Sequence, residues 1–255
     1  AAMNDNDTVD IYVAVRDLEG SRVNARTDLA DVSLTGLAVS PSVQLVQFDE
    51  KSATATFRIE GVCGEALNGK KVTLSIGAVL LEKSDYLSQN TSISVADIAA
   101  AIPNPEFQTL TGNRTYLTVC SDEDTPLFSG DTALLPAQTE SDELNALLPW
   151  GKLIAGGVAD GALHLLICPD EVGRYARYTS VSLVNKKNPD AAGQTLHTVE
   201  FGSVESVADT QYYEYTEYVL PLPEGTGQKE LSIAYDGVIY GQAIHGKWSA
   251  TFQLE

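Results

Sequence analysis

The three histidines of the chain are the residues whose chemistry depends most clearly on spacing. His164, His197 and His245 lie far apart, and none belongs to an H-x-H or H-E-x-x-H pattern. Those patterns bring two imidazole rings to one metal ion, so the histidines predict no metal site. His164 lies inside an apolar run at 162–168 and is predicted to be a hydrogen-bonded core residue.

The sequence context of the possible nucleophiles and the spacing of the carboxylates give little support to the hypothesis that the chain is an enzyme. The chain has no G-x-S-x-G elbow, and none of its three cysteines lies in a protease-like context. The best carboxylate pair is Glu214 and Glu217, which would have to flank one glycosidic bond. They are three residues apart, so on a regular strand they point to opposite faces. The sequence therefore predicts a protein that is not an enzyme, with no catalytic residues, no cofactor and no metal.

Four tyrosines near these glutamates are candidate contact residues for a ligand or a partner. They are Tyr212, Tyr213, Tyr215 and Tyr218. Rings with a polar tip are frequent at binding surfaces, where they form platforms for a sugar or a peptide. The alternative interpretation is an amphipathic strand whose aromatic side chains pair across a sheet.

Apolar and polar residues alternate with a period of two through most of the chain. Val9, Ile11, Val13 and Val15 follow this alternation near the start, and the segment 247–254 follows it at the end. Successive side chains of a strand point to opposite faces, so each such segment predicts a strand with one buried and one solvated side. The elements that position the candidate residues are therefore predicted to be strands.

The predicted fold class is all-β, with two antiparallel β-sandwich domains, immunoglobulin-like or related, and one or two short helices. Ser94 and Asp97 resemble a capping box that opens a short helix ending at Ala101. The domain boundary is predicted just after this helix. The N-terminal sandwich then covers 1–102, and the C-terminal sandwich covers 106–255.

Further signals indicate turns, a second helix and a central strand. Three dipeptides predict tight turns, namely Asn68-Gly69, Asp160-Gly161 and Asp236-Gly237. A second short helix is predicted between Thr139 and Pro149. The run at 162–168 is apolar on both faces, which is typical of a central strand covered on both sides.

The composition excludes one class of partner. The 255 residues include 35 acidic and 16 basic ones, which gives a formal net charge of −19. Such a polyanion repels phosphate backbones, and no Lys/Arg cluster offsets the repulsion, so nucleic acid is excluded. No stretch reaches the roughly 18 apolar residues that span a bilayer, so membrane attachment would need an upstream anchor. Whether Cys63 and Cys120 form a disulfide is left open.

Four segments resemble a known family. They are NDTVDIYVAVRDLEGSRVNARTDLAD at 6–31, GKLIAGGVADGALHLLI at 151–167, YTEYVLPL at 215–222 and GKWSATFQLE at 246–255. These segments resemble the extracytoplasmic domain of membrane-anchored anti-sigma-factor-like regulators of Gram-positive bacteria, a domain of unknown function. They are strand and turn signatures and carry no catalytic residues.

The resemblance implies a cellular role. Proteins of this kind have a short cytoplasmic segment that restrains a sigma factor, one membrane span and an exported sensory region, which this chain would be. The expected function is a non-enzymatic extracytoplasmic sensory or interaction domain, anchored to the cytoplasmic membrane in the full-length protein. Its expected partners are an unknown extracellular ligand or protein, and the sigma factor through a cytoplasmic segment absent from this chain. The alternative is a cell-surface glycan- or peptide-binding or adhesion module.

Overall fold

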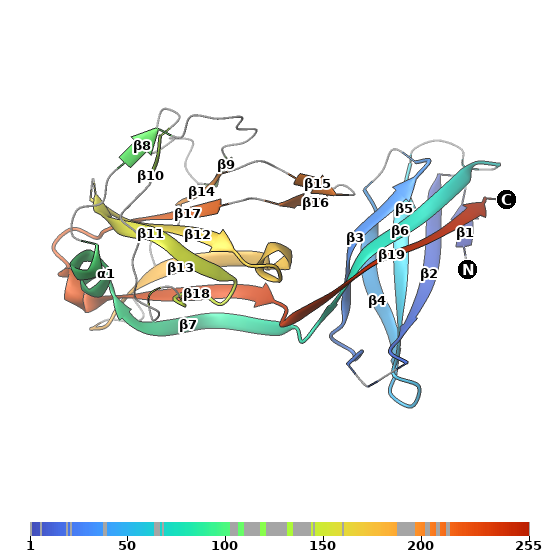
Figure 1. Ribbon diagram of the computed structural model, residues 1–255, viewed down its shortest axis with the longest axis horizontal. Coiled ribbons are helices and arrows are strands. Elements are labelled where there is room, and N and C mark those ends of the chain that lie inside the picture. Colours follow the sequence, from blue (N-terminus) through green and yellow to red (C-terminus); the bar gives the residue numbers. More distant parts are fainter. Residues whose placement is uncertain are drawn as a thin grey trace. The chain divides into compact units, whose positions relative to one another are not determined.

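The fold is seen in a computed structural model of the chain (Figure 1). It describes residues 2–5, 7–18, 20, 22–37, 40–63, 67, 69–102, 107–109, 118–120, 132–134, 144, 146–159, 161–187, 197–201, 205–207, 210–212 and 215–254. Most of the described chain is strand, in several antiparallel sheets, which confirms the all-β class. The sandwich and immunoglobulin-like assignments stay predictions. The helix predicted between Thr139 and Pro149 lies largely outside the described residues.

The chain divides into two compact units, and each unit is discontinuous in sequence. Unit 1 comprises Ala1–Ser84, Ser206–Gln211 and Tyr240–Glu255. Unit 2 comprises Asp85–Glu205 and Tyr212–Ile239. This division differs from the predicted boundary after residue 102 for two reasons. The helix before that boundary packs into the core of unit 2, and the last strand of the chain pairs within unit 1.

Unit 1 contains two larger sheets. The first has the strand order β1-β2-β5-β4, with β1 at Ala2–Asp5, β2 at Thr8–Arg16, β5 at Thr54–Val62 and β4 at Ser42–Asp49. The second has the order β19-β6-β3, with β19 at Gln242–Gln253, β6 at Lys71–Leu81 and β3 at Asp28–Thr35. The last strand, β19, runs alongside β6 (Figure 1).

Alternate residues of these strands fill one hydrophobic core. Ile11 and Phe57 enter it from the first sheet, and Leu34 and Leu74 enter it from the second, each with at most 3% of its surface exposed. In β5, every second residue from Ala55 onward is buried. The period of two in the sequence is therefore the period of burial, and the two sheets form layers around a shared core.

Unit 2 contains two larger sheets and several shorter elements. The five-stranded sheet has the order β11-β12-β17-β14-β9, with bounds Gly151–Ala159, Ala162–Pro169, Tyr215–Pro221, His197–Phe201 and Thr118–Cys120. The three-stranded sheet has the order β13-β18-β7, with bounds Arg177–Asn185, Leu231–Ile239 and Ser84–Ser94. The short strands and 3-10 helices of unit 2 are β8 Phe107–Thr109, β10 Thr132–Leu134, η1 Gly173–Tyr175 and η2 Gln228–Glu230. The paired short strands β15 Glu205–Val207 and β16 Thr210–Tyr212 lie mostly in the segment Ser206–Gln211, which belongs to unit 1.

Helix α1, at Val95–Ala101, opens on the predicted capping box. The hydroxyl of Ser94 accepts a hydrogen bond from the backbone N–H of Asp97, at 3.2 Å. The carboxylate of Asp97 accepts one from the backbone N–H of Ser94, at 2.7 Å. These bonds satisfy two amide groups near the start of the helix. Val95 and Ile98 are fully buried in the core of unit 2, so the cap also fixes the helix against that core.

Two of the predicted turns have the positive φ that glycine allows. β11 and β12 form the hairpin predicted at Asp160-Gly161, with Ala159 opposite Ala162 and a φ of 78° at Gly161. Gly69 has a φ of 77°, as predicted, but the strands that it separates, β5 and β6, belong to different sheets.

The hairpin predicted at Asp236-Gly237 is wrong, because β18 continues through both residues. Asp236 lies opposite Ser180 in the ladder between β18 and β13, next to a shift of register. Its carboxylate accepts a hydrogen bond from the backbone N–H of Ser88 on β7, at 2.7 Å. The dipeptide therefore marks an irregular position inside a sheet, where glycine is also common.

Candidate functional site

His164 and Glu217 form a buried pair in unit 2. Nδ1 of His164 lies 2.8 Å from Oε1 of Glu217, and the two residues are 1% and 3% exposed. His164 lies on β12 and Glu217 on β17, the neighbouring strand, where it is opposite Leu166. The prediction that His164 is a hydrogen-bonded core residue is confirmed.

Strand β12 explains why this pair is enclosed. Its alternate residues Leu163, Leu165 and Ile167 belong to the main core of unit 2. His164 and Leu166 point to the other face of the sheet and are buried as well. The strand lies between β11 and β17 in the sheet, and the residues on both of its faces are buried. The prediction of a central strand covered on both faces is confirmed.

An imidazole beside a carboxylate has the chemistry of a general base, but proton transfer needs the reacting group within hydrogen-bond distance. With exposures of 1% and 3%, neither side chain of the pair presents an atom to a substrate in solution. The arrangement instead satisfies two polar groups inside a sheet, where an unpaired one would be costly. Glu214, the other carboxylate of the glycosidase hypothesis, lies outside the described residues.

The other two histidines lie in different units. His245 lies on β19 in unit 1 and is exposed. His197 lies on β14 in unit 2, where it is opposite Val219 of β17, the residue that His164 faces from β12. In the part of the chain that the structure describes, no three His, Cys, Asp or Glu side chains are grouped so that they could hold a metal ion.

The four candidate tyrosines have different positions. Tyr218 is 1% exposed, and its hydroxyl lies 3.0 Å from that of Thr179. Its ring belongs to the core, so Tyr218 does not act as a surface contact. Tyr213 lies outside the described residues, and for Tyr212 and Tyr215 the structure describes only the strands β16 and β17 that contain them. A contact role for these three stays a prediction.

Tyr218 is part of an aromatic cluster centred on Trp150. Trp150 meets the rings of Tyr218 and Tyr235 edge-on, with centroids 6.3 and 5.6 Å apart. Tyr235 also contacts Tyr86, at 5.6 Å. Burial, with a smaller contribution from Tyr86, raises the pKa of Tyr235, so its phenol stays neutral over a wider pH range. The cluster packs in and against the core of unit 2.

A different kind of feature lies in unit 1, an apolar cavity of about 260 Å³ that we call the unit 1 groove. It is lined by residues of β2, β6 and β19, namely Ile11, Tyr12, Val13, Leu74, Ile76, Trp248, Ser249, Ala250 and Phe252. The cavity is open to solvent at Trp248, which is 44% exposed.

The position of the groove follows from the pairing of β19 with β6. Trp248, Ala250 and Phe252 are alternate residues of β19 and share one face. In the ladder, Trp248 is opposite Ile76 and Ala250 is opposite Leu74. The small side chain of Ala250 lies between two large aromatic ones and leaves the space that forms the groove.

Sequence reasoning missed this groove. The alternation at 247–254 predicts that Trp248, Ala250 and Phe252 form the buried side of a strand, and Trp248 is instead 44% exposed. The available signal was the single small residue between two aromatic ones on the same strand face. That signal has meaning only when the neighbouring strands are known.

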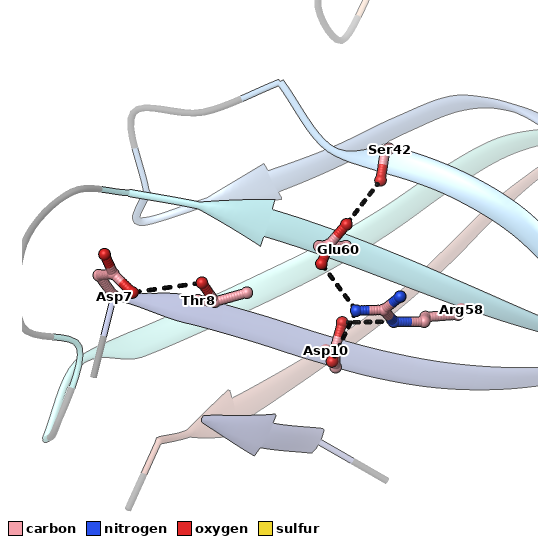
Figure 2. A network of polar contacts seen from close by, with 6 residues as sticks. All are labelled: Asp7, Thr8, Asp10, Ser42, Arg58 and Glu60. Atoms are coloured by element: carbon pink, nitrogen blue, oxygen red, sulfur yellow. Dashed lines mark hydrogen bonds and ion pairs between the residues drawn. The ribbon is translucent and has the colours of Figure 1, made fainter. Parts of the chain in front are cut away.

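The outward face of the first sheet of unit 1 has a contrasting chemistry (Figure 2). Arg58 donates to both carboxylate oxygens of Asp10, at 2.8 and 3.1 Å, and to Glu60 at 2.7 Å. The hydrogen bond to Asp10 raises the pKa of Arg58 further, so the guanidinium keeps its charge. Ser42 extends the network, with its hydroxyl 3.5 Å from Glu60. The charges on this face are thus bound to one another across strands.

Comparisons of the chain with family models, with curated proteins and with solved structures found no match. A search of the described residues for a helix long and apolar enough to cross a membrane found none.

Proposed function

We propose that this chain is a non-enzymatic extracytoplasmic sensory or interaction domain of a single-span membrane protein that regulates a sigma factor. The unit 1 groove is its contact surface for an extracellular ligand or protein. The sigma factor is reached through a cytoplasmic segment, and the membrane through an anchor, both outside this chain. Two of the resembling segments, 6–31 and 246–255, contribute Ile11 and Trp248 to the groove, which supports a joint role for them.

The groove is the observation that carries this proposal. Solvated apolar cavities rimmed by aromatic side chains are a common mark of interaction sites, because covering the apolar surface is favourable. Trp248 retains 44% of its surface in solvent beside the space above Ala250. A ligand or partner in the groove would remove the exposed surface of Trp248 and the apolar surface around Ala250 from water.

The enclosure of the His164–Glu217 pair supports a function without turnover. This pair has the chemistry of a general base, and its two members are buried inside the five-stranded sheet. The net charge of −19 also supports a partner other than nucleic acid, because such a charge repels phosphate groups.

The proposal is tested in the cell of origin with the chromosomal gene. One strain lacks the codons for residues 1–255, and a second carries Ala250→Arg, which places a long charged side chain in the groove. Transcripts are measured across the genome in both strains. The expected result is that the same set of promoters changes in the two strains, because the substitution removes the contact that the whole domain provides.

The matched control is Val46→Arg, which adds the same charge at a 45% exposed residue on β4 in the same unit. This control should leave the transcripts as in the wild type. Transcripts that are unchanged by deletion of the domain contradict the regulatory role. Turnover of any substrate by the purified chain in a broad hydrolase panel contradicts the non-enzymatic part of the proposal.

A cell-surface glycan- or peptide-binding module is the second candidate, and one observation favours it. The groove presents the ring of Trp248 to solvent, at 44% exposure, and exposed aromatic rings commonly stack on sugars or peptides. A glycan array separates this candidate from the first. Binding that is lost in Trp248→Ala, together with unchanged transcripts in the domain deletion, would favour adhesion over regulation.

A further inference from the structure

We infer that the unit 1 groove binds a small uncharged lipophilic molecule, whose alkyl chain of about ten carbon atoms enters the groove. This inference rests on the proposed function, because it names the class of ligand that the contact surface takes. Filling an apolar space with hydrocarbon is favourable, because apolar surface is removed from water.

The face of β19 that is directed toward the core of unit 1 is only partly covered. Trp248 and Ala250 lie on this face, opposite Ile76 and Leu74 of the neighbouring strand β6. Ile76 and Leu74 are 6% and 3% exposed. Trp248 and Ala250 are both exposed, although they share the same face of the sheet. An apolar ligand would complete the burial that ends at β6.

The groove extends from this exposed face to the hydrophobic core. Its most buried lining residues are Ile11, Leu74 and Ile76, which are members of the core of unit 1. Its opening lies at Trp248, on the end strand of the order β19-β6-β3. An alkyl chain that enters at Trp248 would contact core side chains at its far end, so each methylene group would be removed from water.

The ring of Trp248 is held away from the space beside Ala250. A Cβ atom on Gly246 would lie 2.5 Å from Cζ2 of this ring, which is closer than two nonbonded carbon atoms approach. The missing side chain at Gly246 therefore lets the indole pack along β19 toward residue 246. Ala250 lies on the other side of Trp248 in the strand, so the space beside it stays open and the indole forms a wall.

The volume of the groove corresponds to a chain of medium length. A dry apolar cavity of about 150 Å³ in an engineered protein holds benzene, which has six carbon atoms. The groove measures about 260 Å³ and in proportion accommodates about ten. Trp248, Ala250 and Phe252 span about 13 Å along the wall that β19 forms, so an extended chain matches this wall better than a globular molecule does.

The extent of the groove favours a small molecule over a protein as its occupant. A stable protein–protein interface usually involves about 20–30 residues on each side. The groove is lined by nine residues, which come from three strands of one unit. Its volume lies just below the range of about 300–1,000 Å³ that is usual for drug-sized ligands. A ligand smaller than a typical drug is therefore the occupant that fits.

The lining determines which part of the ligand enters. None of the nine lining residues is Asp, Glu, Lys, Arg or His, so a charged group inside the groove would lose water without gaining an ion partner from the lining. The net charge of −19 also disfavours an anionic head group that remains at the opening. The favoured ligand has its alkyl chain in the groove and an uncharged polar head in solvent.

The inference is tested by titrating the purified chain with straight-chain primary alkanols, shorter and longer than about ten carbon atoms. Affinity is measured by isothermal titration calorimetry and by tryptophan fluorescence. The chain has two tryptophans, and Trp150 is 3% exposed and belongs to unit 2, so a ligand in the groove changes the emission of Trp248. Trp248→Phe keeps an aromatic wall, so it should retain binding in the calorimeter and lose the fluorescence change.

Binding of one alkanol per chain is expected. Affinity should rise by up to about fourfold per methylene group, equivalent to about 0.8 kcal/mol. The rise should end near ~10 carbon atoms, because further methylene groups stay in water. The carboxylate with the same chain should bind more weakly at low ionic strength.

Two substitutions at one residue test the position of the ligand. Ala250→Arg and Ala250→Leu should each weaken alkanol binding by about tenfold or more, equivalent to about 1.4 kcal/mol, because both fill the groove. Val46→Arg, at a 45% exposed residue on β4, is the matched control and should bind as the wild type does. Circular dichroism of the three variants checks that they fold.

An affinity that rises with chain length without a limit overturns the inference, because it describes a lipid-like surface and not a groove of fixed volume. Wild-type affinity in both Ala250 variants overturns it, and so does a carboxylate that binds as tightly as the alkanol. A concentration-dependent dimer that buries Trp248 without ligand also overturns it, because the occupant is then a second copy of the chain.

The outcomes separate this inference from the proposed function. If no alkanol binds but Ala250→Arg still alters transcripts, only the class of ligand is wrong. If alkanols bind with the expected limit and the transcripts do not change, the proposed function is wrong and the ligand site remains.

Discussion

Oε1 of Glu217 lies 2.8 Å from Nδ1 of His164, and this contact joins the neighbouring strands β17 and β12 within the five-stranded sheet of unit 2. The two residues are 53 positions apart in the sequence, so the contact links strands that come from distant parts of the chain. Both residues are almost fully buried, which makes the contact specific, because neither polar group can exchange its partner for bulk water.

Replacement of one member of this pair should be far more destabilising than replacement of both. Glu217→Leu leaves the imidazole of His164 without its carboxylate, and breaking a buried pair costs about 3–5 kcal/mol. The double variant with His164→Leu should recover most of that loss, since an apolar pair of similar volume is often neutral or better. Urea unfolding measures the free energies. Glu224→Leu at an exposed position is the control, and equal losses in the single and double variants would contradict the role of the pair.

The capping box of α1 should make stability depend on pH in an acidic range. Hydrogen bonds from the hydroxyl and then the backbone N–H of Ser94 lower the pKa of Asp97. Because the folded-state pKa is the lower one, the stabilisation is complete above the ordinary aspartate pKa of about 3.9. It is lost as the pH falls through the folded-state pKa. The difference in unfolding free energy between wild type and Asp97→Asn should therefore shrink on acidification.

The same cap can be tested through its serine. Ser94→Ala removes the acceptor for the backbone N–H of Asp97 and should cost about 1 kcal/mol at neutral pH. Ser94→Thr keeps a hydroxyl and should retain most of the stability. An equal loss in the two variants would show that packing at this buried position, and not the hydroxyl, determines the effect.

Two glycines of unit 2 should respond differently to alanine. A Cβ on Gly173 would lie 1.7 Å from the carbonyl oxygen of Trp150, so the backbone must shift, and overpacking of this kind costs about 1–3 kcal/mol or more. A Cβ on Gly161 meets nothing within 4 Å, and only its φ of +78° is unfavourable, at about 1–2 kcal/mol. Gly173→Ala should also change the near-ultraviolet circular dichroism of Trp150, whereas Gly161→Ala should not.

Local signals in the sequence were sufficient for several elements. The alternation of Val9, Ile11, Val13 and Val15 predicts a strand at the position of β2, and the capping box predicts α1. The hairpin between β11 and β12 follows from Asp160-Gly161. Each of these signals involves residues that are close together in the chain. The interactions that form the element, such as a cap or a turn, therefore involve the same residues as the sequence pattern.

Nonlocal pairing explains what could not be predicted. β7, at Ser84–Ser94, has a largely polar sequence without clear alternation, and it is a strand because it pairs with β18 at the edge of a sheet. β19 follows unit 2 in sequence but pairs with β6 in unit 1, which makes unit 1 discontinuous and places the boundary elsewhere. At Asp236-Gly237 the turn signal is overridden because both flanking segments belong to one strand, whose register shifts there.

The candidate sites also depend on nonlocal strand pairing, which the sequence does not predict. The apolar neighbours of His164 predict that it is buried and hydrogen-bonded, but its partner could be identified only when β12 and β17 were seen as neighbours. The unit 1 groove depends on the end of β1, the edge of β2 and the pairing of β19. No single segment of the chain contains that information.

A larger apolar side chain at Ala250 should fill the unit 1 groove and stabilise unit 1. Leucine at this position lies opposite Leu74 and between Trp248 and Phe252, so Ala250→Leu removes apolar surface from water without displacing a buried neighbour. Filling a cavity commonly adds about 0.5–2 kcal/mol to the free energy of unfolding. Urea unfolding measures the gain, and Gln253→Leu on the solvated face of the same strand is the control.

The same substitution should change the same transcripts as Ala250→Arg, because leucine occupies the space that an occupant of the groove needs. Gains in stability that are equal at Ala250 and Gln253 would mean that strand propensity, and not the cavity, is the cause. Greater stability together with unchanged transcripts would contradict the groove as the contact surface. The groove thus predicts a gain in stability together with a loss of regulation, which surface hydrophobicity alone does not produce.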